Sequence, residues 1–142
     1  MEWLFCKALK DPEAIEQAEK AFNVVFPSDF KAHVLTYNGG RPRPNCFDLG
    51  HAKELAVKTL LSFNKDDVET IYGAYQGLLR ETSQPVVPFM SDPAGNYICF
   101  AFQGESDPAV VFWDHEQAGS ERDLTFICES FTAFVNRLYA ID

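Results

Sequence analysis

The sequence is poor in positive charge. It contains 12 lysine and arginine residues against 21 aspartate and glutamate residues, which gives a formal net charge of −9. A surface of this sign repels nucleic-acid phosphates and anionic lipids, so we expect neither nucleic acid nor a membrane as a partner. The imbalance is largest in residues 72–142, where 3 basic residues stand against 10 acidic ones, compared with 9 and 11 in residues 1–71. The sequence therefore favours a partner that is itself basic.

Long apolar runs and paired cysteines are also missing. No run of 18 apolar residues occurs, and the first residues lack the basic segment and apolar stretch of a secretory signal. The four cysteines form no C-x-x-C pair, which argues against a zinc knuckle or a thioredoxin-type site. Cys99 and Cys128 lie in apolar runs and are expected to be buried, which leaves Cys46 as the cysteine expected to be exposed. These features predict a reduced, cytoplasmic protein with no metal and no cofactor.

Aromatic residues, by contrast, are abundant. They make up 14% of the 142 residues, and phenylalanine alone occurs 13 times. A chain of this length and composition can bury a sizeable core without disulfides or metal. We therefore expect one domain over residues 1–142.

Apolar residues at helical spacing predict four helices. The first two are separated by Phe26-Pro27, and the second ends at Asn38-Gly39-Gly40, because glycine tolerates the left-handed conformation of a helix C-cap. The predicted helices cover about residues 12–22, 28–37, 68–79 and 131–139. Residues suited to cap their N-termini are Asp11, Ser28 or Asp29, Asp66 or Asp67, and Ser130.

Short runs rich in β-branched and aromatic residues predict strands. The connections between the last four runs are short, so these strands are expected to be antiparallel neighbours. One connection is the turn from Asp92 to Asn96, in which Gly95 or Asn96 takes a positive φ angle. The predicted strands are Cys46–Leu49, Leu55–Phe63, Val86–Met90, Tyr97–Phe102, Val110–Trp113 and Leu124–Cys128. The predicted fold class is α+β, with helices packed against a mainly antiparallel sheet.

The segment Trp113-Asp114-His115-Glu116 is the most enzyme-like part of the sequence. A histidine between two carboxylates can serve acid–base chemistry, which leaves a hydrolase using Asp114, His115 and Glu116 as one hypothesis. Consecutive residues at a strand end point in alternating directions, however, and the sequence has neither a G-x-S-x-G motif nor a protease-type cysteine motif. The favoured interpretation is a strand end with Trp113 on the core and the acids in water.

Four segments occur in an order typical of one family. They are Phe26-Pro27-Ser28-Asp29-Phe30 with Tyr37-Asn38-Gly39-Gly40-Arg41-Pro42, Val87-Pro88-Phe89 with Asp92-Pro93-Ala94-Gly95-Asn96, Val110-Val111-Phe112-Trp113-Asp114-His115-Glu116, and Glu129-Ser130-Phe131-Thr132-Ala133-Phe134. Together they resemble the SMI1/KNR4 family of the SUKH superfamily over about residues 12 to 139. Phe26 replaces the usual leucine, and Cys128-Glu129 replaces the usual Ala-Asp. Neither change touches known chemistry, since the family is not known for catalytic residues.

The resemblance implies an α+β domain with a binding role. In bacteria it implies an immunity protein that binds and neutralises a cognate polymorphic toxin, often a nuclease. In fungi, related proteins are regulatory scaffolds, so a scaffold that binds a host protein is the alternative. We predict a non-enzymatic immunity protein, monomeric or homodimeric, whose partner is a basic protein toxin.

An acidic segment in the C-terminal half is the candidate contact surface for that toxin. Six acidic residues and one base, Arg122, lie between positions 105 and 123. A toxin that acts on RNA or DNA needs a basic surface, and complementary acid speeds association and improves selectivity. A solvated loop is the competing interpretation. The predicted contact residues are Glu105, Asp107, Asp114, Glu116, Glu121 and Asp123.

Overall fold

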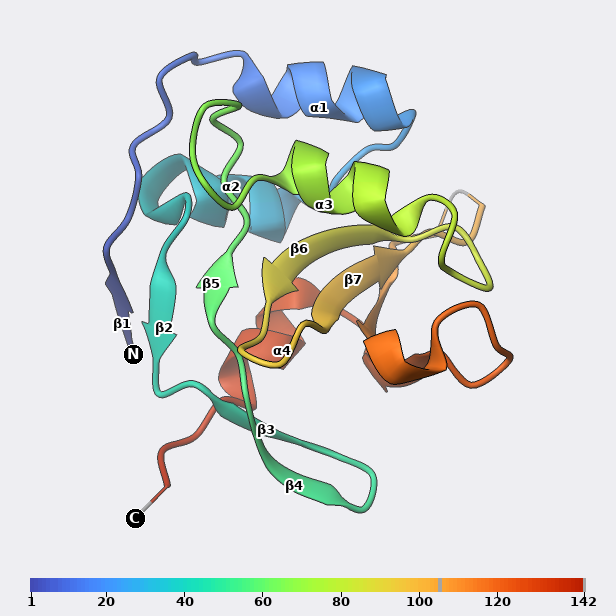
Figure 1. Ribbon diagram of the computed structural model, residues 1–142. Helices are drawn as coiled ribbons and strands as arrows, with labels where there is room; N and C mark the ends of the chain where they lie inside the picture. The colour runs from blue at the N-terminus through green and yellow to red at the C-terminus, as the bar shows by residue number, and fades with distance from the viewer. Residues whose placement is uncertain (105, 142) are drawn as a thin grey trace.

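The computed structural model describes residues 1–104 and 106–141, and its helices and strands are drawn in Figure 1. The helices are α1 (Ala14–Phe22), α2 (Ser28–Tyr37), α3 (Ile71–Leu78), the short 3-10 helix η1 (His115–Gln117) and α4 (Phe131–Asn136). The strands are β1 (Glu2–Leu4), β2 (Arg41–Arg43), β3 (Cys46–Leu49), β4 (Ala52–Ala56), β5 (Thr59–Leu60), β6 (Val87–Ser91), β7 (Tyr97–Ala101), β8 (Ala109–Trp113) and β9 (Leu124–Cys128).

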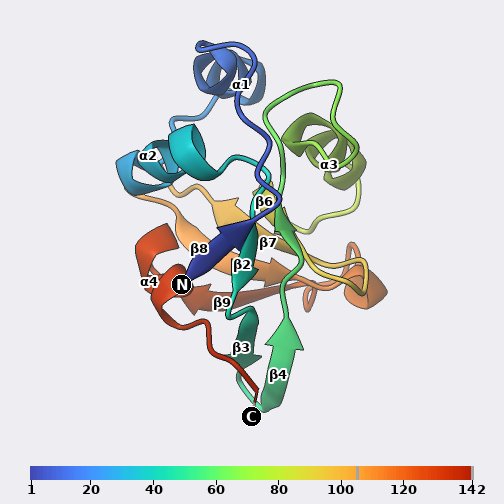
Figure 2. The same cartoon turned by 90° about the vertical axis from the view of Figure 1, so that its left-hand side faces the viewer.

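Five of these strands form the central sheet. Their order is β5-β6-β7-β8-β9, and every neighbouring pair is antiparallel. The predicted α+β fold with a mainly antiparallel sheet is therefore confirmed. Two smaller antiparallel pairs, β1–β2 and β3–β4, accompany the sheet, and the β3–β4 hairpin projects from the body of the protein (Figures 1 and 2).

The two faces of the central sheet carry different hydrophobic clusters, because side chains alternate along each strand. Phe100 and Phe112 face the larger cluster, to which α1, α2 and α4 contribute. Within it the Phe89 ring stacks on Phe100 with centroids 4.2 Å apart, and Phe30 of α2 meets Phe100 at 5.0 Å. The opposite face carries a smaller cluster of Leu78, Val86, Cys99, Ala101, Val111 and Trp113. Both faces of the middle strands are thus buried.

Of the predicted helix starts, those of α2 and α4 agree with the structure, whereas that of α1 lies too early in the chain. The helix α2 begins at Ser28, but its N-cap is Pro27, so neither Ser28 nor Asp29 is the cap. The helix α4 begins after Ser130, whose hydroxyl accepts a hydrogen bond from the Ala133 N–H at 3.0 Å. The helix α1 begins at Ala14 with Glu13 as its N-cap, so the predicted cap at Asp11 is wrong. Asp11 instead forms a turn before the helix, in which its carboxylate accepts from the Glu13 N–H and its carbonyl from the Ala14 N–H. These starts depend on residues close together in the chain.

The predicted start of the third helix is wrong. The N-cap of α3 is Thr70, whose hydroxyl accepts from the Gly73 N–H at 3.0 Å, and neither Asp66 nor Asp67 caps the helix. Val68, the first residue of the predicted helix, is fully exposed. The reason is that Asp66 and Asp67 bind elsewhere: Asp66 pairs with Lys10, and Asp67 accepts from the Ser62 hydroxyl. The segment before Thr70 is therefore a loop.

The strand predicted at Leu55–Phe63 is divided. Its first part ends β4 at Ala56, and its second part forms β5, which starts at Thr59. The break lies where the chain leaves β3 and joins β6, because the Lys58 N–H donates to the Ser91 carbonyl at 2.8 Å. The first strand, β1, was not predicted, and neither was its partner β2.

The cysteine predictions are correct for two residues and wrong for one. Cys99 and Cys128 are buried, and burial raises the pKa of the Cys99 thiol well above its usual value, which keeps it protonated. Cys46 is buried, not exposed, because the C-terminal segment covers it: Cys46 and Tyr139 exchange two backbone hydrogen bonds of 3.1 and 2.9 Å. Cys6 is the exposed cysteine.

Among the described residues, the structure contains no helix with both the length and the apolar character needed to cross a lipid bilayer.

Candidate functional site

The connection from β8 to β9, residues 114–123, carries the centre of the predicted acidic surface. Trp113 ends β8 inside the smaller cluster, and the Asp114 carboxylate then caps η1 by accepting from the Glu116 N–H at 3.0 Å. The favoured interpretation of this segment, a strand end with a buried tryptophan, is therefore confirmed. Glu116 and Glu121 are exposed, and neither forms an ion pair within residues 1–104 and 106–141. Both carboxylates are available to a partner.

Asp123 has a different role in the same loop. It is fully buried, and its carboxylate accepts hydrogen bonds from the backbone N–H and the hydroxyl of Ser83 and from the Gly119 N–H. The Asp123 carbonyl also accepts from the Asp114 N–H at 2.9 Å. Asp123 therefore holds the loop in place and is not part of an exposed contact surface.

His115 is tied to the neighbouring β6–β7 turn. Its Nδ1 lies 2.6 Å from Asn96 Oδ1, which also accepts from the His115 N–H at 2.9 Å. The Asn96 N–H and side-chain amide in turn donate to the Asp92 carboxylate. In the same turn Gly95 has a φ of 93°, which agrees with the predicted positive φ at Gly95 or Asn96. His115 thus contacts an amide, and Asp114 is engaged as a helix cap. These are contacts of two joined turns, and they do not bring Asp114, His115 and Glu116 together as a catalytic group.

The remaining acids do not join this loop. Asp107 precedes β8, whereas Asp114 follows it, so the two carboxylates lie at opposite ends of the same strand. Asp107 is exposed near Ser28 and Asp29 at the start of α2, with which it lines a small hollow. Glu105 lies outside the described residues. The structure therefore reduces the predicted cluster to Asp114, Glu116 and Glu121 at one end of the sheet.

A groove on another side of the protein was not predicted. It has a volume of about 610 Å³, within the range of ligand-sized clefts. Its walls are the N-terminal segment with Phe5 and the loop with Val68, and both side chains are largely exposed. Phe5 has a positive φ of 59°, an unfavourable conformation for a bulky residue. The Arg41 guanidinium lies 5.8 Å from the Phe5 ring centroid, in range of a cation–π contact.

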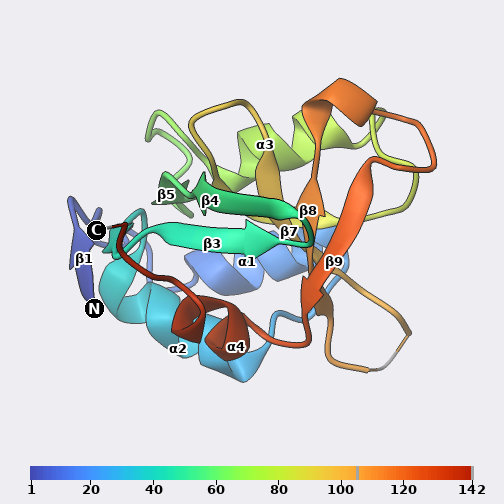
Figure 3. The same cartoon turned by 90° about the horizontal axis from the view of Figure 1, so that it is seen from below.

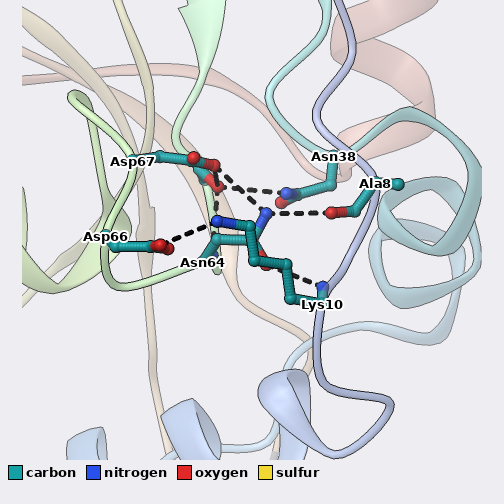
Figure 4. A network of polar contacts seen from close by, with 7 residues as sticks. Ala8, Lys10, Asn38, Asn64, Asp66 and Asp67 are labelled. Carbon is teal, nitrogen blue, oxygen red and sulfur yellow. Dashed lines mark hydrogen bonds and ion pairs between the residues drawn. The ribbon is translucent and has the colours of Figure 1, made fainter.

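A buried polar network supports this groove (Figure 4). The Asn38 side chain donates to the Lys7 carbonyl at 2.7 Å and to the Ser62 hydroxyl at 3.1 Å, and it accepts from the Phe63 N–H at 3.0 Å. Ser62 donates to the Asp67 carboxylate at 2.6 Å. Asn38 therefore joins three segments, a role that sequence reasoning missed when it treated Asn38 only as part of a helix stop. The glycine part of that prediction holds, since Gly39 takes a positive φ of 70°.

Glu69, beside the groove, is ionised and held in place. Burial opposes its charge, but hydrogen bonds from Lys58 and Ser91 outweigh burial and lower the pKa of the Glu69 carboxyl. The Lys10–Asp66 pair at 2.7 Å is exposed on both sides and adds little stability. Of the groove's acids, Asp66 and Glu69 thus have basic partners within the protein itself.

The comparisons with known proteins address the whole fold. The sequence model of the SUKH_6 family, described as SMI1-KNR4 cell-wall, matches residues 12–135. A comparison with curated proteins gives no match. The matched residues run from the turn before α1 to the last helix, and they include the turns and the Ser130 cap described above. The chain belongs to the SMI1-KNR4 family of the SUKH superfamily.

Proposed function

We propose that this chain is an immunity protein that neutralises a basic protein toxin by binding it stoichiometrically. The observation that carries the proposal is the β8–β9 loop, in which Glu116 and Glu121 are exposed while Asp114 and Asp123 hold the backbone. A loop ordered before binding loses little conformational entropy when it binds. Membership of the SMI1-KNR4 family supports the binding role.

In this proposal the protein carries out no chemistry of its own. The toxin's catalytic or substrate-binding surface is basic because its substrate is a polyanion. The carboxylates of Glu116 and Glu121 meet that surface, accelerate encounter and select the cognate toxin among basic proteins. Neutralisation follows because the bound protein excludes the substrate.

The test is capture followed by protection. The tagged protein is used to capture partners from a lysate of its source organism at low and at high salt, and the recovered polypeptide is co-expressed with the wild-type chain or with variants. We expect a basic polypeptide that arrests growth alone and is harmless with the wild-type chain. Glu116→Lys/Glu121→Lys should slow association at least tenfold, within the range of electrostatic steering.

Glu13→Lys/Glu16→Lys at the start of α1 is the matched control. Both glutamates are exposed, and the double change alters the net charge by the same amount at a different place. We expect this control to protect like the wild type. Equal loss in both double variants would contradict the assigned surface, and capture of a non-toxic host protein would favour the scaffold alternative.

A further inference from the structure

The strand β9 forms one margin of the central sheet, and its outer edge is open (Figure 3). Within the described residues it pairs with β8 alone. The other margin is partly covered, because the Leu60 N–H of β5 donates to the Gly40 carbonyl at 2.9 Å. The two margins of the sheet are therefore not equivalent, and β9 is the one that can accept another strand.

The register shows which backbone groups face outward. The Asp114 N–H donates to the Asp123 carbonyl, and hydrogen-bonded pairs alternate with non-hydrogen-bonded pairs in an antiparallel ladder. Phe112–Thr125 is therefore a hydrogen-bonded pair, whereas Trp113–Leu124 and Val111–Phe126 are not. The N–H and C=O groups of Leu124 and Phe126 consequently point away from β8, toward the open edge.

The usual means of blocking an edge strand are confined to one end of β9. Natural edge strands are protected by charged side chains, prolines or bulges. In β9 the register is irregular only after Phe126, and there the Arg137 guanidinium donates to the Ile127 carbonyl at 2.9 Å. Residues 124–126 contain no charge and no proline, and Phe126 is 62% exposed. Residues 124–126 therefore form an unprotected edge with which another strand can pair.

Charge distinguishes between the possible occupants of this edge. Exposed carboxylates bracket the strand, with Glu121 and Glu116 before it and Glu129 after it. Arg122 is an exposed base in the same loop, and Arg137 is already bound to the Ile127 carbonyl of β9. A second copy of the chain would bring another net charge of −9 and the same carboxylates. An extended segment carrying lysine or arginine fits this edge better.

We infer that β9 binds its partner by strand addition: an extended basic segment pairs with Leu124 and Phe126, and an apolar side chain of that segment packs on Phe126. The inference rests on the proposed function for the basic character of the partner. Main-chain hydrogen bonds supply affinity in this mode of recognition, and the flanking glutamates supply selectivity.

The test uses a defined probe and needs no toxin. A capped nine-residue peptide of alternating lysine and valine is added to the ¹⁵N-labelled chain, and amide hydrogen exchange is measured residue by residue. We expect exchange at the Leu124 and Phe126 amides to slow at least tenfold, with no such effect from the peptide in which glutamate replaces lysine. Binding of the lysine peptide without protection of these two amides would overturn the inference, as would no binding at millimolar concentration.

Two variants separate the backbone from the side chain. Phe126→Ala keeps the outward N–H, so residues 124 and 126 should still be protected, although binding weakens. Phe126→Pro removes that N–H without breaking a bond to β8, and it should abolish protection at Leu124. Equal binding by Phe126→Pro and the wild type would refute strand addition, and the wild-type exchange data decide the question if this variant does not fold.

Two further outcomes are informative. Protection at Leu124 and Phe126 that rises with protein concentration in the absence of peptide would assign the edge to a second copy and overturn the inference. Because the peptide experiment involves no toxin, a negative result there leaves the capture and protection experiment valid. Failure of strand addition is thus distinguishable from failure of the proposed function.

Discussion

Glu121 and Asp123 lie two residues apart in one loop, and their carboxylates face different surroundings. Glu121 is exposed, whereas Asp123 is buried among the donors of Ser83 and Gly119. Both residues belong to the same acidic stretch of the sequence, so the sequence alone does not distinguish them. The distinction arises because Ser83 approaches the loop from 40 positions away in the chain. Mutation of the two residues should therefore have different consequences.

Asp123→Ala should destabilise the fold, since it leaves the donors of Ser83 and Gly119 without their acceptor. A hydrogen bond to a charged group contributes about 1.5–3 kcal/mol, so we expect a loss of about 2 kcal/mol in the free energy of unfolding. Thermal and urea unfolding measure this loss. Glu121→Ala serves as the control, and an equally large loss in that variant would contradict the division of roles.

His33 on α2 should make stability depend on pH. Burial lowers the pKa of His33 to about 4, partly offset by Asp29, and its ring packs against Trp3 with centroids 4.3 Å apart. The unfolded chain therefore takes up a proton first as the pH falls below about 6.5, and stability is progressively lost toward pH 4. Because the side chain is only half-buried, we expect a loss of roughly 1–2 kcal/mol.

Urea unfolding between pH 7 and pH 5 tests this dependence. His33→Phe should flatten the curve, because it keeps an aromatic ring and removes the titrating group. His51→Ala, in the exposed β3–β4 hairpin, is the matched control and should keep the wild-type slope. An unchanged slope in His33→Phe would show that other groups cause the pH dependence.

At the scale of the elements, the starts of the helices show how local and distant contacts compete. Ser130 caps α4 as the sequence predicts, because its partner, the Ala133 N–H, lies three positions away. The same reasoning fails for α3, where the contacts of Asp66 with Lys10 and of Asp67 with Ser62 leave Thr70 as the cap. A residue suited to a cap by type becomes one only where no distant partner holds its side chain.

Thr70→Ala should weaken α3 and lower the free energy of unfolding by about 1 kcal/mol, the usual cost of losing an N-cap. Asp66→Ala removes only an exposed ion pair and should leave the unfolding midpoint unchanged within error. Circular dichroism during thermal unfolding compares the two variants. If Asp66→Ala proved the more harmful, the cap would have been assigned to the wrong residue.

At the scale of the whole molecule, charge is distributed unevenly over the ends of the sheet. The strand β8 separates Asp107 from Asp114, so a dense acidic stretch in the sequence becomes two surfaces. Only the end with Glu116 and Glu121 adjoins the start of β9, whose outer edge is open. A partner that binds there meets carboxylates and unpaired backbone groups together.

Association with the captured basic partner should depend strongly on salt. Exposed charges are screened within about 10 Å at 0.1 M salt, so raising sodium chloride from about 50 to about 500 mM should lower the association rate constant roughly tenfold. Dissociation should change less, because backbone and apolar contacts are not screened. Stopped-flow mixing measures both rate constants. An association rate constant that does not change with salt concentration would indicate an apolar contact face instead.

The sequence by itself determined the features that depend on neighbouring residues. The short apolar runs of β7 and β8, the Asp92–Asn96 turn and the Ser130 cap are all features of residues within a few positions of one another. These signals established the α+β class and the family to which the chain belongs.

The tertiary structure alone decided which residues meet across long distances in the chain. It buried Asp123 against Ser83, covered Cys46 with Tyr139, and made Asn38 the link between the N-terminal segment and the loop after β5. It also left the edge of β9 open. The physical reason is that a side chain's burial and partners are set by the packing of distant segments, which local periodicity does not encode.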